Sequence, residues 1–375
     1  MIPPSTLSPR RGERAGVRGS LVFALLLVGC THAKTTEDLG LTYARAAQRG
    51  GLPELQAAGW RLGVDPLDFP AGDTDVIRTL NARVPVVARS AAAFTIAQRD
   101  LIPEGIAYDP ADDVFYVSSI RHGKVVRVTR DGTARDFATG LFAALGVKVD
   151  TVRRRLWVAS YAAPETAGYD TADEGRAAAY EFDLASGRPL RTIRTTKSLL
   201  NDLAIAADGT VYITDSAAGR VLRVAPDATT PETFAEGFGY PNGIALSDDG
   251  AQLFVADFRG ITRIALPSGA RSVIAPPRGE TFSGIDGLSY HRGSLIAIQN
   301  AVGLPRVMRI RLAPVAVEVL EVGNPLFSTP TTGTMAGNDY VYMANPQIRS
   351  FNADHTIWPD ERLRDVVVLK ISTLP

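Results

Sequence analysis

The chain has 375 residues, and its 40 basic side chains (Lys and Arg) equal its 40 acidic ones (Asp and Glu) in number. This neutral balance, without a basic tract that carries interleaved aromatic residues, argues against a nucleic-acid partner. Cys30 is the only cysteine, so a disulfide within the chain is excluded.

The first 30 residues have the pattern of an export signal. Four arginines form a basic start: Arg10, Arg11, Arg14 and Arg18. The apolar run that follows, from Leu21 to Val28, is shorter than the roughly 20 residues that a bilayer span needs. We therefore expect residues 1–29 to be a signal peptide.

The end of this run, Leu27-Val28-Gly29-Cys30, resembles the lipobox of bacterial lipoproteins. The resemblance implies lipidation of Cys30, which would tether the protein to a membrane by lipid. Thr31 next to it, in place of Asp, resembles lipoproteins that are passed on to the outer membrane. The expected location is the bacterial cell envelope, at the periplasmic face of the outer membrane. An ordinary signal peptide with an incidental cysteine is the alternative.

Residues 30–89 precede the repeats that fill the rest of the chain. Apolar residues at helical spacing predict one or two short helices, broken at Gly50-Gly51-Leu52-Pro53. Large apolar side chains are too few here for a separate core. We interpret the segment as a tether and a helical extension that packs on the following domain.

From residue 102 onward a short pattern occurs four times, each time with an oxygen-bearing side chain before an apolar strand. The four copies are Pro103-Glu104-Gly105, Leu200-Asn201-Asp202, Pro241-Asn242-Gly243 and Ile285-Asp286-Gly287. A period of about 40 residues with several short strands per repeat is typical of a β-propeller blade. The fold class predicted for residues 90–375 is therefore all-β, a six-bladed β-propeller.

The ring needs a strand from the other terminus to close its last blade. Ala93 to Ala97 is the candidate, and it would pair with the final run from Val366 to Ile371. The remaining strands expected in blade six are Tyr340 to Ala344 and Ile348 to Asn352.

In a propeller, the starts of the innermost strands meet at the central channel. Glu104, Asn201, Asn242 and Asp286 would then converge on one point. Two carboxylates and two amide oxygens, without cysteine or histidine, form a hard oxygen site that suits Ca²⁺ better than Zn²⁺. The sequence thus predicts one divalent metal per chain, most consistent with Ca²⁺.

Two further segments are candidates for substrate contact. A long loop from Tyr161 to Arg176 lies within the second blade, whose inner strand, Gly146 to Asp150, has no acidic or amide side chain at the converging position. The run from Thr329 to Thr334 would place the hydroxyls of Thr332 and Thr334 at the same channel, where they could hold a substrate oxygen. A Ser/Thr turn that satisfies its own backbone is the alternative.

These motifs resemble those of the gluconolactonase, senescence marker protein and luciferin-regenerating enzyme family of six-bladed propellers. The resemblance implies that Glu104, Asn201, Asn242 and Asp286 bind a divalent metal, and that Asp286 acts as base or nucleophile in the hydrolysis of a lactone or related ester. Two family features are not matched. His122, His291 and His355 read as surface histidines, and no arginine falls at the substrate-binding position of the sugar lactonases.

Two other functions remain open on the sequence alone. The ring could be a non-catalytic platform for a ligand or a protein partner, in which a metal merely braces the inner strands. A phosphotriesterase-like activity on the same metal is the third possibility.

Overall fold

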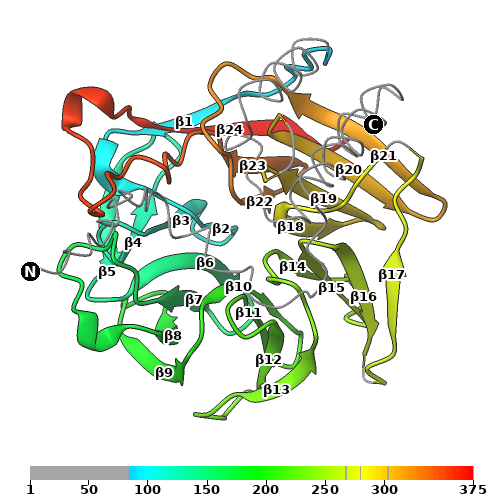
Figure 1. The fold of residues 1–375 in the computed structure, drawn as a ribbon, viewed down its shortest axis with the longest axis horizontal. Coiled ribbons are helices and arrows are strands. Elements are labelled where there is room, and N and C mark those ends of the chain that lie inside the picture. The colour runs from blue at the N-terminus through cyan, green and yellow to red at the C-terminus, as the bar shows by residue number, and fades with distance from the viewer. Residues whose placement is uncertain (1–83, 267, 279, 302–303, 375) are drawn as a thin grey trace, which may run out of the picture.

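The computed structural model describes residues 84–374 except 267, 279 and 302–303. These residues form six four-stranded antiparallel sheets arranged in a ring around a central channel (Figure 1). The prediction of a six-bladed propeller is confirmed. The signal peptide, Cys30 and the helical extension lie outside the described residues, apart from residues 84–89.

The sheets follow one another along the chain, and each is ordered from the channel outward. Blade one contains β2 (Ile106–Asp109), β3 (Val114–Ser119), β4 (Lys124–Val128) and β5 (Ala134–Ala138). Blade two contains β6 (Ala143–Asp150), β7 (Arg155–Tyr161), β8 (Arg176–Asp183) and β9 (Pro189–Thr196). Blade three contains β10 (Leu200–Ile205), β11 (Val211–Asp215), β12 (Arg220–Val224) and β13 (Glu232–Glu236).

Blade four contains β14 (Ile244–Leu246), β15 (Gln252–Asp257), β16 (Gly260–Ala265) and β17 (Arg271–Ile274). Blade five contains β18 (Ile285–His291), β19 (Ser294–Gln299), β20 (Arg306–Leu312) and β21 (Val315–Val322). Blade six contains β22 (Gly333–Ala336), β23 (Asp339–Met343), β24 (Val366–Ser372) and β1 (Ala91–Ile96). The described helices are the 3₁₀ turns η2 (Arg99–Leu101), η3 (Thr171–Asp173) and η4 (Asp360–Arg362), and none is long and apolar enough to cross a membrane.

The hydrophobic core lies between neighbouring blades. One cluster joins Phe94 of blade six to Phe115 of blade one, with ring centroids 4.9 Å apart. Another joins Phe254 of blade four to Leu288 and Leu295 of blade five. Each sheet therefore buries its apolar faces only against its neighbours, as the spacing of the repeats implied.

The ring closes through β1, which pairs with β24 from Ala91 opposite Lys370 to Ile96 opposite Val366. The predicted closure is confirmed. The prediction of a strand over residues 348–352 is wrong, because the third and fourth strands of blade six are β24 and β1. Pro346 has no N–H for a ladder, and Gln347 has a φ of 58°, so the chain turns away from the sheet after β23.

The segment that leads into β1 is fixed to the outer strand of blade five. Val87 pairs with Val322 in an isolated antiparallel bridge. The buried carboxylate of Glu321 accepts hydrogen bonds from the backbone N–H of Arg89 at 2.8 Å, and from the N–H and hydroxyl of Ser90 at 2.9 Å. The start of the propeller is therefore tied to blade five as well as to blade six.

Candidate metal centre

The innermost strands β2, β6, β10, β14, β18 and β22 surround the channel (Figure 1). At the start of several of them, a glycine packs against the backbone of the next blade. A Cβ on Gly105 would lie 2.3 Å from the carbonyl oxygen of Leu145, and one on Gly243 would lie 2.5 Å from that of Asp286. None of these glycines needs a positive φ. They allow the close approach of two blades, and are not the turn formers that Asn-Gly and Asp-Gly usually indicate.

This packing sets the residues before the glycines at one level of the channel. Glu104 precedes Gly105, Asn242 precedes Gly243, and Asp286 precedes Gly287, while Asn201 precedes Asp202 at the corresponding place in blade three. Leu145 holds this level in blade two, in agreement with the absence of an acidic or amide side chain there. Thus all four predicted metal ligands start their strands at the same end of the ring.

Hydrogen bonds connect two of the four side chains directly. The amide Nδ2 of Asn242 donates to Oδ1 of Asp286 at 2.8 Å. The second oxygen of Asp286 accepts a short hydrogen bond from Asn300, which also donates to the carbonyl of Pro330 at 2.8 Å. Asp286 is thereby held from two sides, and Asn300 is a site residue that the sequence reasoning missed.

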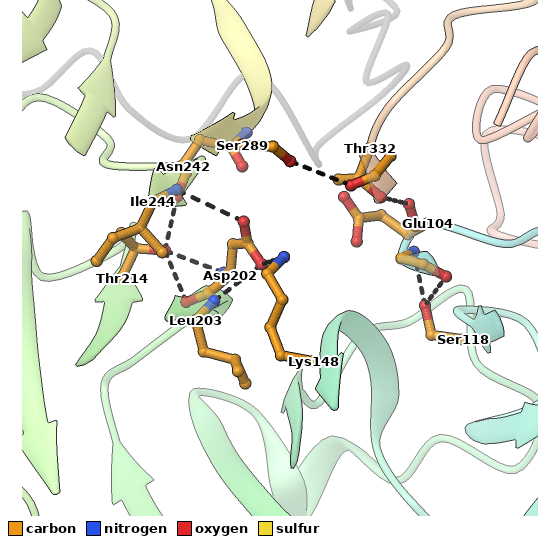
Figure 2. Close-up of polar contacts among 12 residues, drawn as sticks. Glu104, Ser118, Lys148, Asp202, Leu203, Thr214, Asn242, Ile244, Ser289 and Thr332 are labelled. Atoms are coloured by element: carbon orange, nitrogen blue, oxygen red, sulfur yellow. Dashed lines mark hydrogen bonds and ion pairs between the residues drawn. The ribbon is translucent and has the colours of Figure 1, made fainter. Parts of the chain in front are cut away.

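Glu104 joins this group through electrostatics. Burial raises its pKa well above the usual value, and the nearby carboxylates of Asp286 and Asp202 raise it further, whereas the ammonium of Lys148 acts in the opposite direction. Figure 2 shows the Glu104 side chain extending from blade one toward the side of the channel where Asn242 and Asp202 lie. Glu104 and Asp286 therefore share one low-dielectric region.

Asp286 is also buried, and burial is the main cause that raises its pKa, to about 7. The hydrogen bonds from Asn300 and Asn242 lower the pKa, and the carboxylate of Asp202 raises it. Tyr240, two residues before Asn242, has a raised pKa because of burial and because Asp286 and Glu104 lie near its phenol. Negative charge thus accumulates at this level of the channel.

The fourth predicted ligand, Asn201, is buried, and its amide donates to the hydroxyl of Ser216 at 3.0 Å. This hydroxyl in turn donates to the carbonyl of Pro241 at 2.6 Å, so the side chain is anchored to the segment that carries Asn242. The bonds found for the described residues do not link Asn201 directly to Glu104 or Asp286.

The threonines of blade six support the backbone of Glu104. The hydroxyls of Thr331 and Thr332 both donate to the carbonyl oxygen of Glu104, at 2.8 and 2.7 Å. Thr331 lies at the level of the four candidate ligands, because its carbonyl oxygen would be 2.6 Å from a Cβ on Gly287. Thr334 lies further along β22 and is half-buried. The hydroxyl of Thr332 thus already serves the strand start, and its role toward a substrate stays a prediction.

A hard divalent cation fits the donor set. Oε2 of Glu104 and Oδ1 of Asn242 are buried and lack a hydrogen-bond partner among the described residues. Burying an oxygen without a partner costs free energy of folding. Two such oxygens beside a second carboxylate suit an oxygen-binding cation such as Ca²⁺. Within the described residues no group of three His, Cys, Asp or Glu side chains could hold a metal, so two carboxylates would have to act together with amide oxygens.

Among the described residues, the hydrogen bonds found do not link the histidines to the four candidate ligands. His122 contacts Asp100 at 2.9 Å, and His291 is the last residue of β18, at the opposite end of the strand from Asp286. His355 contacts Glu165 of the long loop after β7 at 2.9 Å. Glu165 is buried, and its pair with His355 links the long loop of blade two to that of blade six.

Comparisons with known proteins agree with the fold. Residues 102–288 match the family model described as SMP-30/Gluconolactonase/LRE-like region. A gluconolactonase from Xanthomonas campestris is 19% identical with a TM-score of 0.53, over 76% of this chain and 91% of that one. The calcium-binding protein regucalcin from Agrobacterium tumefaciens is 16% identical with a TM-score of 0.56, over 77% and 95%.

The same fold also carries other chemistry. The PQQ-bound aldose sugar dehydrogenase from Streptomyces coelicolor is 15% identical with a TM-score of 0.52, over 76% of this chain and 97% of that one. No curated protein sequence matches the chain significantly. At these identities the structural likeness establishes the propeller, whereas the activity has to be argued from the site.

Proposed function

We propose, on the premise that this chain belongs to the SMP-30/gluconolactonase/LRE-like family, that the protein is a metal-dependent hydrolase of lactones or related esters. The observation that carries the proposal is the pair of buried oxygens on Glu104 and Asn242 that have no hydrogen-bond partner in the described part of the chain, next to the carboxylate of Asp286. In this proposal Glu104, Asn201, Asn242 and Asp286 hold the ion, and Ca²⁺ is the ion that the oxygen donors favour.

The reaction would need two contributions at the channel, a bound cation and an oriented carboxylate. A divalent cation bound there supplies Lewis acidity toward an ester carbonyl and stabilises developing negative charge. Asn300 and Asn242 hold the Asp286 carboxylate in one orientation, which suits it to take a proton from an attacking water or to attack directly. The substrate in this proposal is a small molecule with an ester bond, a lactone in the first place.

The location is a separate proposal that rests on Cys30. If this cysteine is lipidated, the enzyme works at the bacterial cell envelope, tethered by lipid at the periplasmic face of the outer membrane. Globomycin, which blocks processing of lipidated precursors, should then cause the unprocessed chain to accumulate. A mature chain that lacks Cys30 and fractionates away from membranes would contradict the anchor.

The activity is tested with a panel of lactones, carboxylic esters and phosphotriesters, assayed with Ca²⁺ and with a chelator. We expect the lactones to be opened in the presence of Ca²⁺ and the rate to be lost on chelation. A metal-bound protein that turns over no substrate would favour the non-catalytic platform. Turnover confined to phosphotriesters would favour the third alternative.

The raised pKa values of Glu104 and Asp286 predict how stability depends on pH without a cation. The folded protein holds protons that the unfolded chain releases above about pH 4, so the stability contribution falls as the pH rises toward 7. We expect the chelated protein to have a lower thermal midpoint at pH 8 than at pH 5.5, with a free-energy difference on the order of a few kcal/mol. Added Ca²⁺ should raise the midpoint more at pH 8.

Thermal unfolding followed by circular dichroism measures this dependence. The control is the double variant Glu104→Gln and Asp286→Asn, in which the slope with pH should flatten. Chelated wild-type protein that gains stability from pH 5.5 to pH 8 would show that these two carboxylates do not share a desolvated site.

A further inference from the structure

Blade two contributes a cation to the channel instead of a metal ligand. Lys148 on β6 places its ammonium 2.9 Å from Oδ1 of Asp202 in blade three (Figure 2). The Asp202 side chain is 2% exposed, and the Lys148 side chain is 26% exposed. Asp202 stands where blades one, two, four and five have a glycine: a Cβ on Gly146 of blade two would lie 2.7 Å from Oδ1 of Asp202.

The Asp202 carboxylate accepts hydrogen bonds at both of its oxygens. Besides Lys148, the backbone N–H of Leu203 donates to Oδ1 at 2.8 Å, and that of Ile244 donates to Oδ2 at 3.5 Å. Its own N–H donates to the hydroxyl of Thr214 at 2.9 Å. These contacts hold the carboxylate, and with it the ammonium, beside the candidate metal centre.

The charges at this level of the channel then balance in two parts. Three buried carboxylates, of Glu104, Asp202 and Asp286, face one ammonium. Lys148 compensates Asp202, which leaves two negative charges on Glu104 and Asp286, the charge that one divalent cation neutralises. Lys148 also lowers the pKa of Glu104 electrostatically, so its charge acts on a candidate cation ligand as well as on Asp202.

We propose that Lys148 is a built-in countercharge that sets the affinity of this centre for a divalent cation. Its ammonium offsets the negative field of Asp202 and opposes the entry of a further positive charge, because like charges in a low-dielectric region repel strongly. The channel thus keeps part of its charge compensated when no cation is bound, and binds the cation less tightly than three carboxylates would. This inference rests on the proposed function only in placing the cation between Glu104 and Asp286.

The test measures Ca²⁺ binding by calorimetry on the chelator-treated full chain, without substrate. Lys148→Met removes the charge and keeps the apolar stem, and we expect it to bind Ca²⁺ at least about tenfold more tightly. Asp202→Asn should weaken binding, and the double variant Lys148→Met with Asp202→Asn should return to within about threefold of wild type. Lys148→Arg keeps the charge and should resemble wild type.

The matched control is Lys124→Met, which breaks another lysine–aspartate pair, with Asp136 at 2.7 Å in the outer part of blade one. It should leave Ca²⁺ affinity unchanged. Unchanged or weaker binding in a folded Lys148→Met variant would overturn the proposal. If that variant fails to fold without a cation, the double variant decides, and an affinity more than about threefold from wild type overturns it.

The outcome is separable from that of the proposed hydrolase. Ca²⁺ binding with the expected changes, but no ester turnover, would support the role of Lys148 and remove the enzyme proposal. A wild-type chain that binds no Ca²⁺ while Lys148→Met does would support the role of Lys148 and remove metal dependence from the native protein. If neither binds, both proposals fall.

Discussion

Asp286→Asn is expected to lower kcat for lactone hydrolysis by at least about a thousandfold, because it removes both a cation ligand and the proton acceptor. Glu104→Gln should reduce Ca²⁺ affinity and activity together. Both substitutions remove a buried carboxylate, so the chelated variants should unfold at the same temperature as wild type or above it. Loss of activity combined with retained or increased stability is the signature that a merely structural carboxylate would not give.

Steady-state kinetics at saturating Ca²⁺ and thermal unfolding in chelator measure these two effects. Asp249→Asn serves as the control and should keep full activity. Asp249 lies in the turn between β14 and β15, at the opposite end of blade four from Asn242. Asp286→Asn with wild-type kcat would exclude Asp286 as the base or nucleophile. Glu104→Gln with unchanged Ca²⁺ affinity would remove Glu104 from the ligand set.

Gly105→Ala is expected to destabilise the protein by about 3 kcal/mol, the upper end of what overpacking usually costs. A Cβ at this position would lie 2.3 Å from the carbonyl oxygen of Leu145, and backbone cannot move aside as a side chain can. The backbone of Gly105 cannot shift easily either, because its N–H donates to the hydroxyl of Ser118 at 2.7 Å. Blades one and two would have to separate where Glu104 enters the channel.

Denaturant unfolding of the chelated protein gives the free-energy change. The control is Gly293→Ala, in the open turn between β18 and β19. The φ of 77° there strains any other residue, but no atom of the described residues beyond its chain neighbours would lie within 4 Å of the added Cβ. That substitution should cost about 1 kcal/mol. Equal losses in the two variants would mean that the contact between blades adds nothing beyond backbone strain.

The fold was readable from the sequence because a propeller repeats one local unit. The copies around Glu104, Asn201, Asn242 and Asp286 each start an inner strand, and equal spacing along the chain becomes equal position around a ring. The closing strand followed from the need to cover the open edge of the last blade. Residues 348–352 do not form the predicted strand, because Pro346 just before them lacks the N–H that a continuing ladder needs.

The support of the site was harder to predict, because it comes from strands other than the innermost ones. Asn300 lies just after β19, and Ser216 just after β11, where an apolar second strand ends in polar residues. The same change from apolar to polar occurs at Ser118 after Val117, so this signal was present in the sequence. A polar residue at that position can reach the strand start beside it, as Ser118 reaches Gly105 and Asn300 reaches Asp286.

Lys148 was missed for a different reason. A lysine is not a cation ligand, so a pattern of oxygen-bearing side chains at the strand starts gives no sign of it. A lysine between Val147 and Val149 in an otherwise apolar run is a signal of its own, because a buried or half-buried ammonium needs an anion nearby. The anion is the residue after Asn201, where a glycine would have matched the other repeats.

The pairing of β1 with β24 brings the two ends of the propeller into one sheet, with Ala91 directly opposite Lys370. A short peptide that joins Ser372 to Ser90 would therefore make the ring covalently continuous. New termini could then be opened in any of the turns on the side away from Asp286, such as the one at Gly293. Circular permutants of this kind should fold, and in each of them a different blade would be closed by pairing of the N-terminal and C-terminal strands.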